Sequence, residues 1–316
     1  MSLQSWLLDS DPAIRWQVLR DLTDADPESI AAERARIAKE GWGARLLSMQ
    51  SRRGYWGDRN DPGWMTTVDA LKLLRDFGAD PGDKKVRTAV ARVRDHITWV
   101  PLGARPFFDG ETEPCINGRI LAAGAYFGQD TERLVERLLS DQLKDGGWNC
   151  EAPSSKCSSF HSTICVLEGL LEYEKTLAKP GPIRKARLRA QEYLLKRRMI
   201  RSLRTGEIIE RRWMRFGFPT VWNYDVLRGL DYMREANVKP DERVQEAVRI
   251  VEQRRHQNGR WPLNQQYLDR IGFPMEPGVG RRSHWNTLRA LRVLRWAGRP
   301  GFRFATPAAT RARPRI

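Results

Sequence analysis

Hydrophobic positions recur along this chain at the three- and four-residue spacing of amphipathic helices, and the helical segments come in pairs. The first segment of each pair is richer in charge, and the second is more apolar. We find no convincing strand pattern of alternating apolar and polar residues. The predicted pairs are 41–51 with 64–77, 84–98 with 114–127, 130–143 with 159–174, 183–200 with 219–235, and 241–256 with 283–297.

Two further helices are expected before these pairs. The segment Asp9-Ser10-Asp11-Pro12 reads as a helix cap followed by proline in the first helical turn, and a second helix is expected over 27–39. We therefore expect three parts. They are an N-terminal helical pair in residues 1–40 that packs on a toroid, the toroid itself in residues 41–298, and a basic flexible tail in residues 299–316.

One leucine in each apolar segment gives the five pairs a common register. Before three of these segments lies a glutamine-to-tryptophan motif, at 50–56, 142–148 and 257–261. Recurrence at about 45 to 60 residues is typical of stacked two-helix units. The sequence therefore predicts an all-α fold, an α/α toroid of five helical hairpins with the apolar helices inside, plus the N-terminal pair. The register leucines are Leu71, Leu121, Leu167, Leu227 and Leu288.

Composition narrows the class of protein. The 316 residues carry a formal net charge of +16, but the excess arginine is scattered along charged helices and is most simply explained as solvated surface. No apolar run is long enough to span a membrane, and the start of the chain lacks the pattern of a secretion signal. We therefore expect a cytoplasmic protein with no membrane span. Four cysteines are too few for a disulfide scaffold in a chain of this length.

Two of the four cysteines and one histidine suggest a metal site. Cys115 and His161 each stand six positions before a register leucine, so they occupy the same height on adjacent inner helices, and Cys150 follows the turn just before the His161 helix. Thiolates and imidazole are ligands that zinc prefers, and three protein ligands leave the open position of a catalytic site. We therefore predict Zn²⁺ bound by Cys115, Cys150 and His161. Glu113 is a candidate fourth ligand, support for a ligand, or base.

Other polar and aromatic residues share the inner face of the predicted ring. Tyr224 and Asp225 are candidates for proton transfer. Arg212, in the basic run 211–215, is a candidate for binding an anionic group. The remaining candidates for substrate binding, in a polar band below the predicted ligands and around the rim, are Asp69, Arg119, Trp64, Trp222, His284 and Trp285.

The glutamine-to-tryptophan motifs resemble those of the terpenoid cyclase and protein prenyltransferase superfamily, whose members are α/α toroids. Squalene-type cyclases of that superfamily protonate their substrate with an Asp-x-Asp-Asp motif. This sequence has no such motif, because Asp24-Ala25-Asp26-Pro27 lacks the final acid and lies outside the repeats. The resemblance therefore implies the fold but not cyclase chemistry.

A second resemblance is local. Glu113-x-Cys115 and the segment 160–165, which contains His161, resemble the zinc-binding motifs of protein prenyltransferase β subunits. That family has aspartate where Glu113 stands, and Cys150 has no counterpart that we can assign. The resemblance implies catalytic zinc and transfer to a substrate thiolate. It also implies a second subunit, because those enzymes require a separate α subunit.

Three functions fit these observations. The first is a zinc-dependent enzyme that acts by transfer on an apolar or anionic small molecule in the central cavity of the toroid. The second is a zinc-dependent hydrolase of esters or phosphotriesters that uses metal-activated water. The third is a non-catalytic toroid that binds a lipid or a protein and contains structural zinc. We do not expect nucleic-acid binding, because the basic tail lacks interleaved aromatic residues.

Overall fold

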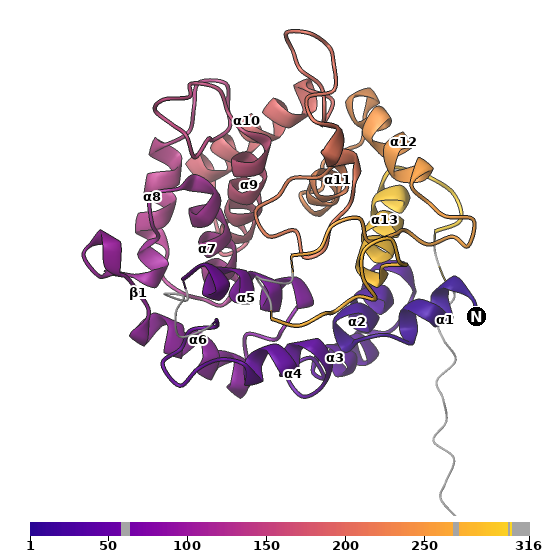
Figure 1. Ribbon diagram of the computed structural model, residues 1–316, viewed down its shortest axis with the longest axis horizontal. Coiled ribbons are helices and arrows are strands. Elements are labelled where there is room, and N and C mark those ends of the chain that lie inside the picture. Colours follow the sequence, from indigo (N-terminus) through magenta and orange to yellow (C-terminus); the bar gives the residue numbers. More distant parts are fainter. Residues whose placement is uncertain (58–63, 268–271, 303, 305–316) are drawn as a thin grey trace, which may run out of the picture.

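The computed structural model describes residues 1–57, 64–267, 272–302 and 304. In this part of the chain, nearly all regular structure is helical, and inner helices form a ring that outer helices surround (Figure 1). The prediction of an all-α toroid is confirmed. None of the described helices combines the length and the hydrophobicity that crossing a membrane requires.

From α4 onward, outer and inner helices alternate along the chain. The inner layer consists of α2 (Pro12–Leu22), α5 (Trp64–Phe77), α7 (Pro114–Tyr126), α9 (Phe160–Glu174), α11 (Val226–Glu235) and α13 (His284–Trp296). The outer layer consists of α3 (Pro27–Arg34), α4 (Gly41–Ser48), α6 (Lys84–His96), α8 (Glu132–Ser140), α10 (Gly181–Lys196) and α12 (Gln245–Gln253).

A few short elements complete the fold. The helix α1 (Leu3–Leu8) precedes the ring. Between α6 and α7, the strands β1 (Thr98–Trp99) and β2 (Arg105–Pro106) pair antiparallel. The 3₁₀ helices are η1 (Val100–Leu102), η2 (Phe107–Asp109), η3 (Arg211–Met214) and η4 (Glu242–Val244).

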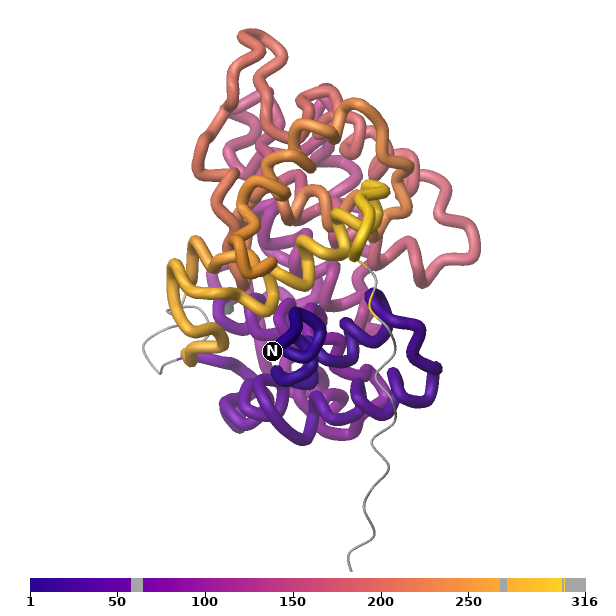
Figure 2. Tube along the Cα trace, turned by 90° about the vertical axis from the view of Figure 1, so that its right-hand side faces the viewer, coloured from indigo at the N-terminus to yellow at the C-terminus, as the bar shows by residue number. Residues whose placement is uncertain are grey.

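The N-terminal helices belong to the ring. Trp16 of α2 donates a hydrogen bond from its indole nitrogen to the carbonyl oxygen of Phe77 at the end of α5, at 2.7 Å. On its other side, Gln17 of α2 accepts a 2.6 Å hydrogen bond from Arg292 of α13. Figure 2 shows the indigo N-terminal helices next to the yellow α13. The helix α2 therefore closes the inner ring between α13 and α5.

Glycines allow α7 and α9 to pack closely. An added Cβ atom at Gly118 would lie 2.4 Å from the backbone of Cys165, and one at Gly169 would lie 2.5 Å from the carbonyl oxygen of Gly118. These approaches are too close for any larger side chain, so the two backbones meet directly. Gly118 faces Cys165 while Leu121 faces Gly169, so the helices run parallel. Equivalent positions of successive repeats lie side by side, as the leucine register predicted.

Each glutamine-to-tryptophan motif joins an outer helix to the following inner helix. Trp148 donates from its indole nitrogen to the carbonyl oxygen of Leu138 at 2.7 Å, and from its backbone N–H to the hydroxyl of Thr163 at 3.1 Å. The motif tryptophan therefore ties neighbouring helices together. Equivalent 2.7 Å indole bonds join Trp56 to Leu46 and Trp261 to Val251.

The substitution Trp148→Phe is expected to lower the free energy of unfolding by about 1–3 kcal/mol, because the buried carbonyl group at the end of α8 loses its hydrogen-bond donor. Urea denaturation measures this loss. The control is Trp222→Phe, which changes a side chain that is 40% exposed, and it should cost less than about 0.5 kcal/mol. Equal losses in the two variants would contradict a tie between α8 and α9.

The loop before α11 lies where the sequence predicts a helix. The predicted inner helix 219–235 begins only at Val226. Val221 has a φ of 50°, outside the helical region, and Asp225 caps α11 by accepting a hydrogen bond from the backbone N–H of Arg228. In Figure 1 this loop lies within the outline of the ring. Trp222 and Tyr224 are therefore loop residues.

Candidate functional site

Glu113, Cys115 and Cys150 bring three ligand atoms together. A carboxylate oxygen of Glu113 and the sulfur atoms of both cysteines all lie within 4.8 Å of one another. Cys115 is buried, Cys150 is half-buried and Glu113 is exposed, so solvent reaches one side of the group. We call these three residues the Glu-Cys-Cys cluster.

Local structure fixes the two sulfur atoms. The helix α7 begins at Pro114, which places Cys115 in its first turn. The backbone N–H of Cys115 donates to Cys150 Sγ at 3.4 Å. Ser162, in the first turn of α9, lies with its hydroxyl oxygen 3.2 Å from both the backbone nitrogen and the sulfur of Cys150. Cys150 therefore lies at the N-terminal end of α7 among hydrogen-bond donors, a setting that favours a thiolate.

These contacts give the two thiols different acidities. The Cys115 thiol hydrogen-bonds to Cys150 and so lowers the pKa of Cys150, and the Ser162 hydroxyl and the backbone N–H of Cys115 act in the same direction. The pKa of Cys115 is raised by the same thiol–sulfur contact and by burial. Cys150 therefore ionises first. A coordinating cation would also remove the Cys115 proton, since metal-bound thiols are deprotonated.

The cluster fits a zinc ion. With Zn–S bonds of about 2.3 Å and Zn–O bonds of about 2.0–2.2 Å, a tetrahedral sphere places neighbouring donor atoms about 3.5 Å apart. Cys115 Sγ and Glu113 Oε2 are 3.6 Å apart. Two thiolates suit zinc better than magnesium or calcium, which prefer oxygen ligands.

His161 makes its contacts with the loop before α11 and is not part of the Glu-Cys-Cys cluster. Its Nδ1 accepts a 2.8 Å hydrogen bond from the backbone N–H of Tyr224, and its ring packs against Trp222 with centroids 5.1 Å apart. Burial and the nearby charge of Arg228 lower the pKa of His161 to about 4. The neutral ring therefore carries its proton on Nε2. Zinc could bind Nε2 only after that proton has left. The role of His161 as a zinc ligand therefore stays a prediction.

Tyr224 and Asp225 are buried and hydrogen-bonded within the protein. The Tyr224 hydroxyl donates to the carbonyl oxygen of Met199 at 2.6 Å. Asp225 accepts hydrogen bonds from the backbone N–H groups of Arg228 at 2.7 Å and Gly217 at 3.3 Å. Burial raises the pKa of both side chains. These contacts hold the loop and the start of α11, and a role in proton transfer stays a prediction.

Asp69 and Arg119 form a buried ion pair between α5 and α7. Arg119 Nε also donates to the carbonyl oxygen of Cys115 at 3.3 Å. The pair therefore supports the first turn of α7, which carries one sulfur of the Glu-Cys-Cys cluster. Both side chains are almost fully buried, and neither lines the central cavity described below.

The other predicted substrate-binding residues are dispersed. Arg212 is exposed on η3, and Trp222 is exposed beside His161. His284 stacks on Trp6 of α1 with ring centroids 3.9 Å apart, away from the cluster. The side chain of Trp64 lies outside the described residues.

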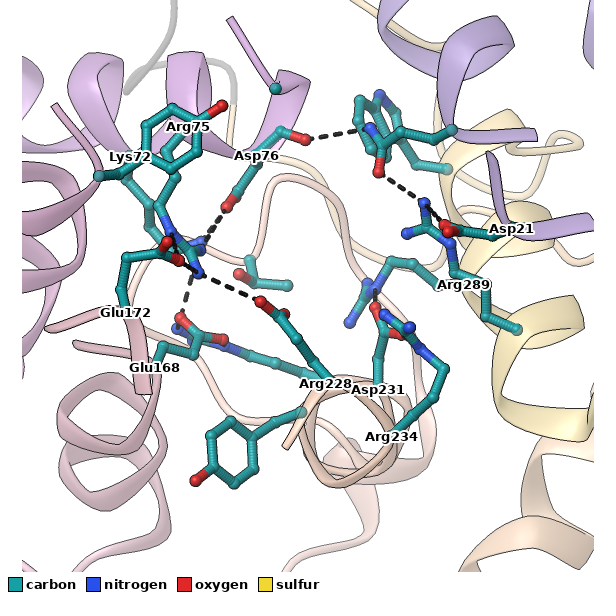
Figure 3. Close-up of a pocket in the computed structure, with 18 of the residues that line it drawn as sticks. Asp21, Lys72, Arg75, Asp76, Glu168, Glu172, Arg228, Asp231, Arg234 and Arg289 are labelled. Carbon is teal, nitrogen blue, oxygen red and sulfur yellow. Dashed lines mark hydrogen bonds and ion pairs between the residues drawn. The ribbon is translucent and has the colours of Figure 1, made fainter. Parts of the chain in front are cut away.

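The inner helices enclose a cavity of about 420 Å³ (Figure 3). Its walls come from all six inner helices, with Tyr126 as the contribution of α7, and Phe218 and Thr220 of the loop also line it. Trp285, a predicted substrate-binding residue, is buried in this wall and stacks on Phe218 with ring centroids 4.1 Å apart. Most of the lining side chains are charged, so the cavity does not suit a purely apolar ligand.

The cavity and the Glu-Cys-Cys cluster lie at different heights in the ring. Cys115 stands six positions before its register leucine, whereas the cavity residues Arg75, Asp231 and Arg292 stand four positions after theirs. Ten helical residues correspond to roughly 15 Å along the axis. The cluster residues are not among those that line the cavity.

We did not predict the charged residues that line the cavity from the sequence, although they occupy a regular position relative to the register leucines. Polar residues recur one position after the register leucines, one turn deeper than the predicted polar band, and they line the cavity. They are Lys72, Glu168, Arg228 and Arg289.

Comparisons with known proteins assign this chain to no family. No family model and no curated protein matches the sequence. Solved structures of the type II terpene cyclase MstE from Scytonema are similar. The apo form has 16% sequence identity and a TM-score of 0.44 over 90% of this chain and 85% of that chain. A variant in complex with geranylgeranyl dihydroxybenzoate has 15% identity and a TM-score of 0.42, over 91% and 87%. Likeness at this level assigns neither a family nor an activity.

Proposed function

We propose that this protein is a zinc-dependent enzyme that transfers a group to or from a small apolar or anionic molecule at the Glu-Cys-Cys cluster. The observation that carries this proposal is the convergence of two sulfur atoms and a carboxylate oxygen within 4.8 Å, on a group that is open to solvent at Glu113. Three protein ligands with an accessible fourth position are typical of catalytic zinc, whereas structural zinc has four protein ligands.

The charge of the cluster favours transfer over hydrolysis. Zinc held here would supply a site for a sulfur nucleophile rather than strong activation of water, because three anionic ligands outweigh its two positive charges. Transfer to a thiol is therefore the reaction that we propose, with hydrolysis as the competing outcome.

In this proposal, Cys115 and Cys150 hold the metal, and Glu113 is the third ligand or a base. Tyr224 acts as a positioning residue, because its backbone N–H holds His161 of α9, the helix that packs against α7, which carries Cys115. Trp222 offers an exposed aromatic face for the substrate.

Purified protein is expected to contain about one zinc ion per chain. Cys115→Ala and Cys150→Ala should each lower zinc affinity at least tenfold, because each removes a thiolate ligand. Elemental analysis and competition with a chromogenic chelator measure this. The matched control is Cys157→Ala, which changes an exposed cysteine outside the cluster.

Several results would change the assignment. Zinc content that is the same in Cys115→Ala, Cys150→Ala and Cys157→Ala would contradict the cluster. A loss in His161→Ala as large as in the cysteine variants would place His161 in the coordination sphere, after release of its bond to Tyr224.

Activity separates transfer from hydrolysis. We expect chelator-sensitive alkylation of a small thiol by an activated electrophile, and loss of that turnover in Cys150→Ala. Chelator-sensitive cleavage of esters or phosphotriesters without thiol alkylation would instead establish the hydrolase. Stoichiometric zinc with neither turnover would favour a binding protein with structural zinc.

A further inference from the structure

The charges that line the cavity fall into two groups. Around α5, α9 and the two ends of α11, four cationic side chains face four carboxylates, and each cation has its own carboxylate. This half of the cavity is therefore electrically balanced. The pairs, with N–O distances of 2.6 to 2.9 Å, are Lys72–Asp76, Arg75–Glu172, Lys175–Glu235 and Arg228–Glu168.

The other half, formed by α2, α13 and the α11 residues Asp231 and Arg234, has an excess of positive charge. Four arginines line it and share two aspartates, so two positive charges have no carboxylate of their own in the cavity wall. We call the four arginines the arginine cluster. They are Arg20, Arg234, Arg289 and Arg292, and the aspartates are Asp21 and Asp231.

Asp225 does not remove this excess. It lies 3.8 Å from Arg289 but does not line the cavity, and its oxygens already accept backbone hydrogen bonds from Arg228 and Gly217. Burial also raises the pKa of Asp225, which weakens its tendency to carry a charge. Even a fully ionised Asp225 would leave one positive charge uncompensated.

Two members of the arginine cluster have buried donors without an acceptor. Among the described residues, Arg292 Nε and Arg289 Nη2 have no hydrogen-bond partner. Their side chains are only 5% and 6% exposed, and they lie one turn apart on α13. Buried polar groups are nearly always hydrogen-bonded, so these two donors are left short of an acceptor within the protein. Figure 3 shows Arg289, Arg234 and Asp231 gathered on one side of the cavity, opposite Arg75 and Glu172.

The acidity of Arg292 agrees with this division, whereas, against the opposing effect of burial, Asp21 raises the pKa of Arg20 and Asp231 raises the pKa of Arg234. Burial and the neighbouring charges of Arg234 and Arg20 lower the pKa of Arg292 to about 10, despite the opposing effect of Asp21. In the balanced half, burial acts in the same sense, but Glu172 and other carboxylates raise the pKa of Arg75. The carboxylates around Arg292 therefore do not fully compensate its burial and the neighbouring positive charges.

We propose that the arginine cluster binds the phosphate group of a small phosphate monoester. A phosphate dianion matches the excess charge, and its oxygens suit the planar donor fork of arginine. The volume of about 420 Å³ leaves room for an organic group, and the stacked rings of Trp285 and Phe218 provide an aromatic wall for it. The site goes beyond the proposed zinc chemistry, because it lies at another height in the ring and does not require the metal.

The test is titration calorimetry with phenyl phosphate at fixed ionic strength. We expect saturable binding that Arg292→Met weakens at least tenfold. Because Arg292 is buried, a second variant, Arg20→Gln, changes an arginine that is 44% exposed, and it should weaken binding about threefold or more without unfolding the protein. The matched control is Lys175→Met in the balanced half, which should bind as the unchanged protein does.

The outcomes discriminate sharply. Absence of saturable binding, or affinities that are unchanged in both arginine variants, would overturn the site. An equal loss in Lys175→Met would overturn it too, because it would show a general charge effect. Succinate should bind at least tenfold more weakly than phenyl phosphate, and equal affinity would overturn the phosphate assignment. Chelator-treated protein should retain the affinity, and a loss would contradict a site separate from the metal.

Discussion

Arg228→Met is expected to lower the free energy of unfolding by about 3–5 kcal/mol, because it leaves a buried carboxylate without its main partner. Arg228 makes two hydrogen bonds of 2.7 Å to Glu168, and the two side chains are 2% and 14% exposed. It also donates to the carbonyl oxygen of Asn223 at 2.7 Å, so the loop before α11 loses an anchor. Urea denaturation at pH 7 measures the loss.

Two further variants isolate the cause. The double variant Glu168→Gln/Arg228→Met removes the stranded charge, so it should recover part of the loss seen in Arg228→Met. Arg94→Met breaks an exposed pair with Asp95 and should leave the unfolding midpoint unchanged. A double variant that is less stable than Arg228→Met would show that lost packing, and not an unpaired charge, dominates.

Acidification is expected to destabilise the protein steeply between about pH 5 and pH 2. Although burial opposes the effect, Arg228 and Lys72 hold the pKa of Glu168 well below its usual range, and Arg292 and Arg20 do the same for Asp21. A carboxylate with a depressed folded-state pKa contributes stability above its unfolded pKa of about 4. That stability is lost as the pH falls toward the folded value.

Urea midpoints measured from pH 7 to pH 3 test this expectation. Glu168→Gln should start lower at pH 7 and fall less steeply, because one titrating group has been removed. Glu28→Gln, at an exposed position of α3, should give a curve parallel to that of the unchanged protein. Asp225 acts in the opposite sense, since its raised pKa makes its ionised form costly at neutral pH. A flat curve for the unchanged protein would contradict the role of the ion pairs.

The toroid was predictable because its determinants are local and repeated. Helical periodicity, the register leucines and the tryptophan motifs each recur along the chain, and parallel packing of α7 on α9 then places equal register positions at equal heights. The same argument brought Cys115 to the level of the first turn of α9. The helix boundary at Val226 was missed because an apolar segment with a buried loop residue such as Val221 has the same composition as a helix.

The leucine register gives the height of a residue along its helix. The direction in which its side chain points depends on how the helix packs. The residue of α9 that contacts Cys150 is Ser162, one position after His161, and one position turns a helix by about 100°. His161 thereby faces the neighbouring loop. The charges of the cavity could not be paired from sequence either, because partners such as Arg75 and Glu172 are separated by 97 positions and meet only in the closed ring.

The contact between α13 and α2, which closes the ring and which we call the seam, limits the order in which this protein can fold. Arg292 and Gln17, which meet across the seam, are 275 positions apart. A ribosome must therefore synthesise the chain through α13 before the first inner helix, α2, can meet its second neighbour. Until then the inner face of α2 stays open on one side, and pairing across such a distance is slow because loop-closure entropy must be overcome first. Ring closure is thus a late step in folding, and both the cavity and its arginine cluster form only with it.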